Sequence, residues 1–79
     1  KINIDVKVLV DNNLDHVGNS LSKRIRTLSK DEKVEISGKL EEMGTFTVKG
    51  TIWYLANSMG VSVPTLYRYI AAAKKSSLK

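Results

Sequence analysis

Residues 56–70 decide the fold, and they read Ala56-Asn-Ser-Met-Gly60-Val-Ser62-Val-Pro64-Thr-Leu66-Tyr-Arg68-Tyr-Ile70. Ahead of Gly60, apolar residues recur with the i, i+3, i+4, i+7 spacing of a helix face, at Ile52, Leu55, Ala56 and Met59. After it, Ser62 is a favourable N-cap and Pro64 suits a first helical turn, where its missing N–H costs little. The stretch therefore predicts one helix ending at Gly60 and another over about residues 63–75.

Only residues 60–62 separate these two helices, which is too short a link for an antiparallel hairpin. A glycine in so tight a turn is typical of the helix-turn-helix unit. Ala56 lies where the helices approach each other and a larger side chain would push them apart. We expect the other buried positions at Leu55, Met59, Val61 and Leu66. Such a unit holds its second helix outward as a rod that fits the major groove of B-DNA.

A third helix precedes the unit. Ser29 followed by Glu32 has the pattern of a capping box, so this helix is predicted to begin near Lys30, and Gly44 is placed to end it. The prediction is an all-α, three-helix domain over residues 29–75, followed by a frayed tail at 76–79.

The N-terminal part reads differently. Residues 1–10 alternate apolar and polar side chains, which is the period of a half-buried strand. We interpret them as the severed last strand of a preceding sensor domain. Residues 11–28 then read as a linker, with a loop over 11–19 that exposes His16 and a possible short basic helix around Leu21 and Ile25.

Composition narrows the function classes. The 79 residues suit one small domain, and they contain no apolar run near the length of about 18 that a membrane helix needs. Without cysteine, and with one histidine, the chain offers neither a disulfide nor an evident metal site. We therefore expect a cytoplasmic protein that is not an enzyme and that needs no cofactor.

The net charge of +5 is unevenly distributed. Residues 49–79 carry five Lys and Arg side chains and no Asp or Glu, and residues 23–30 carry four more cations without an acid. The acid-free C-terminal stretch contains the turn and the predicted recognition helix. An anionic partner is indicated, and double-stranded DNA is the first candidate.

Arg68 is the expected base reader on the free face of the last helix, because its planar guanidinium can pair with both O6 and N7 of guanine. Around it we expect polar contacts to phosphate or base edges and apolar contacts to thymine methyl groups, from Ser62, Thr65, Tyr67, Pro64 and Ala71.

The start of the preceding helix is expected to position the DNA backbone. Lys49, Gly50 and Thr51 offer a cation, backbone N–H groups and a hydroxyl to a phosphate. Such contacts orient the protein on DNA and carry no sequence information.

Aromatic side chains leave another function open. Trp53 reads as half-buried packing against the helix that starts at Lys30, whereas Tyr54 and Asn57 read as pointing away from the core. If Trp53, Tyr54 and Tyr67 were instead anchors for a partner, the domain would be a protein-interaction module.

The segments from Lys30 to Ile36, Gly44 to Gly50 and Ala56 to Ile70 together resemble the C-terminal helix-turn-helix domain of the YheO-like family of bacterial transcriptional regulators. The resemblance covers about residues 28–73. It implies a role in transcription regulation, with a PAS-like sensor domain ahead of this segment through which any small-molecule effector acts. We further expect a homodimer in the full-length protein.

Residues 60–70 are also similar to the DNA-binding domain of serine-recombinase invertases, in which the positions of Pro64 and Arg68 lie on the reading face. This similarity is shorter. It leaves open that the domain targets a recombinase to DNA, and it agrees on the placement of Arg68.

Overall fold

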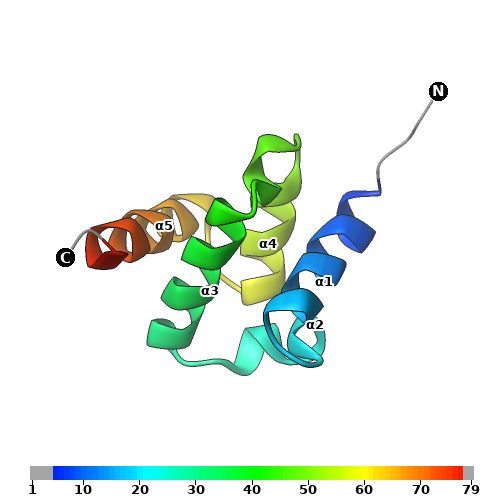
Figure 1. The fold of residues 1–79 in the computed structure, drawn as a ribbon, viewed down its shortest axis with the longest axis horizontal. Helices are drawn as coiled ribbons and strands as arrows, with labels where there is room; N and C mark the ends of the chain where they lie inside the picture. The colour runs from blue at the N-terminus through cyan, green and yellow to red at the C-terminus, as the bar shows by residue number, and fades with distance from the viewer. Residues whose placement is uncertain (1–4, 78–79) are drawn as a thin grey trace.

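The computed structural model describes the backbone of residues 5–77, and over that range the chain is helical with no strand. Its elements are α1 (Val6–Val17), α2 (Leu21–Arg24), the 3-10 turn η1 (Ile25–Thr27), α3 (Lys30–Glu42), the 3-10 turn η2 (Thr45–Thr47), α4 (Thr51–Met59) and α5 (Val63–Ser77). Figure 1 shows α3 and α4 at the centre, with α1 and α5 on opposite sides of them. The all-α prediction is confirmed, and no helix among these residues is long and apolar enough to cross a bilayer.

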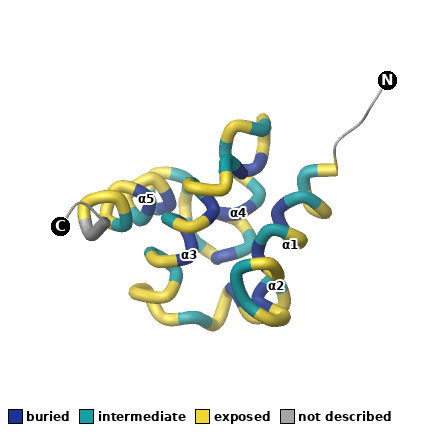
Figure 2. The backbone as a smooth tube through the Cα atoms, viewed as in Figure 1, coloured by how far each residue is buried: buried dark blue, intermediate teal, exposed yellow. Residues whose placement is uncertain are grey.

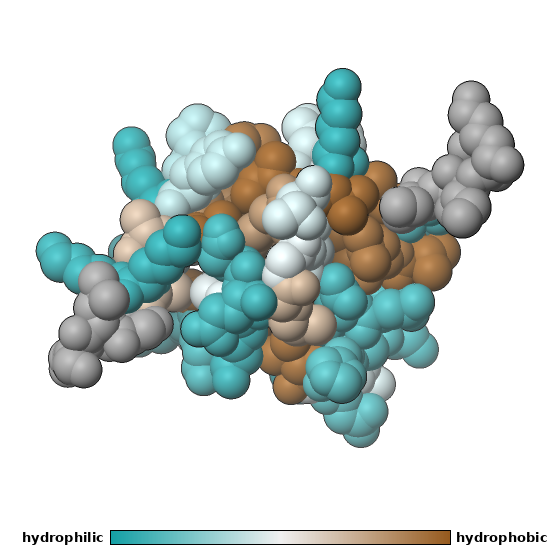
Figure 3. Space-filling model, turned by 45° about the horizontal axis from the view of Figure 1, so that its top comes forward, coloured by the Kyte–Doolittle hydropathy of each residue, from teal (hydrophilic) through white to brown (hydrophobic). Residues whose placement is uncertain are grey.

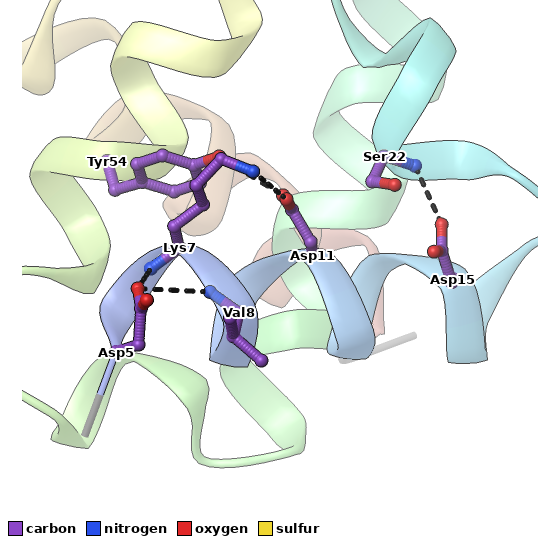
Figure 4. Close-up of polar contacts among 7 residues, drawn as sticks. All are labelled: Asp5, Lys7, Val8, Asp11, Asp15, Ser22 and Tyr54. Atoms are coloured by element: carbon purple, nitrogen blue, oxygen red, sulfur yellow. Dashed lines mark hydrogen bonds and ion pairs between the residues drawn. The ribbon is translucent and has the colours of Figure 1, made fainter. Parts of the chain in front are cut away.

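The strand predicted for residues 1–10 is wrong from Val6 onward, and residues 1–4 lie outside the described range. Residues 6–17 form α1, which also replaces the loop predicted for 11–19. Asp5 precedes the helix, and its Oδ1 accepts hydrogen bonds from the backbone N–H groups of Lys7 at 3.0 Å and Val8 at 3.4 Å (Figure 4). This arrangement is an N-cap.

The physical reason lies in a second period within the same residues. Val6, Val10 and Leu14 recur every four residues, and both Val10 and Leu14 are fully buried. The Tyr54 hydroxyl on α4 donates to Asp11 Oδ1 at 3.2 Å, and Asp11 Oδ2 also pairs with Lys7 Nζ at 3.4 Å (Figure 4). Burial against the rest of the domain therefore outweighs the strand preference of the valines.

Residues 11–28 do not form a linker. The short basic helix is present as α2 and η1, and it is part of the core because Leu21 and Ile25 are each only 3% exposed. The Ser22 backbone N–H donates to Asp15 Oδ1 at 3.0 Å, which ties α2 to α1 (Figure 4) and lowers the pKa of the Asp15 carboxyl.

The beginning and end of α3 follow the prediction. Ser29 Oγ accepts the Glu32 backbone N–H at 3.2 Å, and the Ser29 backbone N–H donates to Glu32 Oε1 at 3.0 Å, so both halves of the capping box form. Because the carboxylate accepts that N–H, the pKa of Glu32 lies below its ordinary value. The helix ends ahead of Gly44, which takes a left-handed φ of 78°.

One apolar core joins all five α-helices, and Figure 2 shows the buried positions where the helices face one another. The buried apolar residues of this core are Val10, Leu14, Leu21, Ile25, Ile36, Leu40, Leu55, Ala56, Met59, Leu66 and Ile70. Helices α1 and α2 thus complete the core of the three-helix unit, so the predicted three-helix domain is enlarged at its N-terminal side.

Candidate nucleic-acid interface

The turn between α4 and α5 is the three-residue link that was predicted. Gly60 ends α4 with a φ of 75°, and the Val61 N–H donates to the Ala56 carbonyl at 3.0 Å. The Gly60 N–H donates to the Asn57 carbonyl at 3.2 Å, which completes the pattern of a Schellman motif. A side chain at position 60 would strain the backbone, because L-residues rarely adopt this conformation.

Ser62 precedes α5 and forms the predicted N-cap. Its hydroxyl oxygen accepts the Thr65 backbone N–H at 3.3 Å and lies 2.9 Å from Thr65 Oγ1. The Leu66 N–H donates to the Ser62 carbonyl at 3.0 Å. The helix then continues to Ser77, two residues beyond the predicted end.

Helix α5 is held at both ends of its inner face. Near the turn, Leu66 is fully buried, and Ile70 is 7% exposed one turn later. Farther along, α5 crosses α3 so closely that a Cβ atom on Gly38 would lie 2.5 Å from Ala73 Cβ. Lys74 Nζ also pairs with Glu41 Oε2 at 3.7 Å. The buried contacts and the close crossing fix the direction in which the outer face of α5 points.

The outer face carries most of the residues expected to contact DNA. Pro64, Tyr67, Arg68 and Ala71 are all exposed, with Tyr67 at 56%. Ser62 is exposed and Thr65 is half-buried, and their hydroxyls lie against each other at the start of the helix. Six candidate residues, the exposed Arg68 among them, therefore lie at the start of α5 or along its first nine residues.

Of the three residues at the start of α4 that were expected to contact a phosphate, two are exposed and one is buried. Lys49 and Gly50 are exposed, as a backbone contact requires. Thr51 is fully buried, and its Oγ1 lies 2.9 Å from the Thr45 carbonyl oxygen and 2.8 Å from that of Val48. Because this hydroxyl is used inside the protein, Thr51 holds η2 against α4, and the phosphate contact proposed for its side chain is wrong.

Two aromatic side chains also differ from prediction. Trp53 is 64% exposed, so it is not packed half-buried against α3. Tyr54 is half-buried against the core, with its hydroxyl bonded to Asp11, and does not point away from it. Asn57 is exposed, as expected.

Besides Trp53 and Tyr67, two large apolar side chains outside α4 and α5 are exposed. Val8 is 51% exposed on α1 and Met43 is 42% exposed at the end of α3. The face drawn in Figure 3 shows apolar surface across its centre and toward α1, with polar side chains projecting around it. Among the described residues, no three His, Cys, Asp or Glu side chains lie close enough to hold a metal ion.

Sequence reasoning missed two cations at the C-terminal end of α4. Arg26 Nη2 donates to the Asn57 carbonyl at 3.2 Å, and Lys33 Nζ donates to the Met59 carbonyl at 3.1 Å. Lys33 thus bonds a carbonyl at the helix end, and Arg26 adds a second hydrogen bond to the Asn57 carbonyl, which also accepts the Gly60 N–H. Both positive charges complement the negative end of the helix dipole. Arg26 belongs to the basic stretch 23–30 that the sequence shows and Lys33 follows it, but their partners lie 31 and 26 residues away in sequence.

Helices α4 and α5 are joined by a short turn with a left-handed glycine, and α5 packs one face on the core and exposes the other. This arrangement defines a helix-turn-helix domain. The model of a family described as HTH domain matches residues 9–71. The chain belongs to this family. The match begins inside α1, in agreement with the burial of Val10 and Leu14 in the common core. Comparison with curated proteins and with solved structures gave no significant match.

Proposed function

We propose that this domain binds double-stranded DNA in a sequence-specific manner, with α5 in the major groove. The observation that carries the proposal is the outer face of α5, where Arg68 and its neighbours are exposed while Leu66 and Ile70 anchor the inner face. An α-helix with side chains is about 10–12 Å wide, and the major groove is about 12 Å wide. A rigid helix supported from one side can therefore enter the groove with its outer face against the bases.

The side chains divide into readers and positioning groups. Arg68 pairs with guanine, and Pro64 and Ala71 offer methyl or methylene surface to thymine. Tyr67, Ser62 and Thr65 bring hydroxyls to phosphates or base edges. Lys49, with the backbone at Gly50, contacts the DNA backbone from the start of α4.

We further propose that the full-length protein is a cytoplasmic bacterial transcriptional regulator of the YheO-like kind, without catalytic activity. The motif resemblance supports this assignment. A single helix-turn-helix usually binds weakly, and dimers reach useful affinity by occupying two half-sites about one helical turn apart. A homodimer with a sensor domain ahead of this segment would meet that requirement and would place the effector outside this domain.

Two other functions can be distinguished from this proposal by experiment. As the targeting domain of a recombinase, this segment would bind DNA by the same face, and a serine-nucleophile domain would be found elsewhere in the full-length protein. As a protein-interaction module, it would use Trp53, whose 64% exposure is the observation that favours this function. The module would leave α5 unoccupied by DNA.

The first test is the salt dependence of DNA binding. With about four phosphate contacts, log affinity should fall against log salt concentration with a slope near −3.6, because each contact releases condensed counterions. Fluorescence anisotropy of a labelled duplex, titrated with the protein between 50 and 200 mM salt, measures the slope directly. An affinity that does not change with salt would contradict the proposal.

A further inference from the structure

We propose that Arg26, which lies outside the two-helix unit, is an additional DNA-phosphate contact placed beside the start of the recognition helix. This inference rests on the proposed DNA binding and extends it to a residue on η1. It assigns to the α2–η1 segment a part in binding besides its part in the core.

Arg26 is attached to the turn by its guanidinium. Nη2 donates to the Asn57 carbonyl at 3.2 Å, and a Cβ atom on Gly60 would lie 3.2 Å from Nη1. Glycine at position 60 thus provides the space that the guanidinium occupies. The preceding residue, Ile25, is 3% exposed and anchors η1 in the core. The position of the Arg26 charge is therefore fixed twice, by the anchored backbone of η1 and by the hydrogen bond of its guanidinium.

The guanidinium keeps donors for a ligand. Arginine has five N–H donors, one of which is used at Asn57, and the Arg26 residue is exposed. The carbonyl end of α4 stabilises the positive charge without neutralising it. A planar fork of this kind suits phosphate oxygens, and pre-organisation lowers the entropy lost on binding.

The position of Arg26 beside the turn suits a contact at the edge of the DNA major groove. Helix α5 begins at Val63, three residues after Gly60, so its first Cα atom lies within roughly 10 Å of that glycine. Phosphates line both edges of the major groove, which is about 12 Å wide. When the N-terminal half of α5 enters the groove, a cation beside the turn lies close to one strand of the backbone. Lys33 adds positive charge at the same helix end.

Arg24, only two residues away, provides a contrast. Its Nη2 donates to the Asn19 carbonyl at 3.4 Å, and it lines a surface hollow together with Glu32 and Glu35. Its charge contributes to lowering the pKa of Glu32. Arg24 is thus bonded to the segment between α1 and α2, in a hollow that acidic residues also line, whereas Arg26 is bonded at the turn between α4 and α5.

The test compares Arg26→Gln with Arg24→Gln in the salt titration described above. Glutamine retains an amide donor that can reach toward the Asn57 carbonyl but lacks the charge. Arg26→Gln should reduce the magnitude of the salt slope by about 0.9, the contribution of one phosphate, and should leave base preference unchanged. Arg24→Gln should leave the slope as in the unsubstituted protein.

A purely structural role for Arg26 predicts another result, because a displaced turn lowers affinity by the same factor at every salt concentration. An unchanged slope in folded Arg26→Gln would overturn the inference, even if Arg68→Ala still relaxed specificity. If Arg26→Gln kept the slope and Arg68→Ala also kept the full base preference, the proposed function itself would be contradicted. If Arg26→Gln does not fold, NMR of the guanidinium groups in the unsubstituted protein replaces it: Arg26 signals should shift on adding duplex, and unshifted signals would reject the contact.

Discussion

Replacing Arg68 by alanine is expected to remove most of the preference for the best duplex at one base pair. A bidentate arginine–guanine contact contributes roughly 1–3 kcal/mol of discrimination, so the affinity ratio between that duplex and a single-base variant should fall by roughly 5- to 150-fold. Arg68 is exposed on the outer face of α5, and its truncation leaves the core untouched. The ratio can be measured by competition anisotropy with a duplex selected from a randomised pool.

The matched control is Lys75→Ala. Lys75 is also an exposed cation on α5, but it lies beyond the half of the helix that enters the groove. Its loss should weaken binding to all duplexes alike, if it changes binding at all. Equal specificity in Arg68→Ala and in the unsubstituted protein would show that Arg68 is not the reader.

Replacing Leu66 by alanine is expected to have the largest effect on stability. Leu66 is fully buried on the inner face of α5, and a Leu-to-Ala change at such a site costs about 2–5 kcal/mol through lost burial and the cavity left behind. A domain of this length has a free energy of unfolding of roughly 4–12 kcal/mol. The variant should therefore lose much of its stability, as measured by urea denaturation followed by circular dichroism.

Tyr67→Ala is the control for this experiment, since Tyr67 is the adjacent residue and is 56% exposed. Its unfolding free energy should change by about 0.5 kcal/mol or less. If Leu66→Ala were as stable as Tyr67→Ala, α5 would not be anchored as the structure describes.

Features governed by local chemistry could be predicted from the sequence. The Ser29 capping box, the left-handed Gly44 and Gly60, and the N-cap at Ser62 each depend on residues a few positions apart. The i, i+3, i+4 spacing of apolar residues in α4 identified its buried face for the same reason. These features fix the turn and hence which helix is presented outward.

The N-terminal helix could not be predicted, because its valines satisfy two periods at once. Alternation favours a strand, and the spacing of Val6, Val10 and Leu14 favours a helix; local preference cannot decide between them. Packing against α4 decides, through the burial of Val10 and Leu14. This packing is a tertiary contact, which the local sequence pattern does not contain.

The positions of Thr51 and Arg26 could not be predicted either, because each depends on a contact that the local sequence pattern does not show. Thr51 is buried because η2 folds back so that the carbonyls of Thr45 and Val48 reach its hydroxyl. Arg26 gains its place from the Asn57 carbonyl, 31 residues away. Residue type and spacing do not reveal such partners, whereas the outward-facing side chains of α5 follow directly from helical geometry.

If α5 is the surface that binds DNA, NMR mapping of the bound protein will show it. Addition of duplex DNA to ¹⁵N-labelled protein should perturb backbone amide signals at the start of α5, around Thr65 and Arg68, and near Lys49 and Gly50. Signals of the exposed part of α1, around Val8, should stay in place. Perturbations confined to the surroundings of Trp53, or none along α5, would contradict the account.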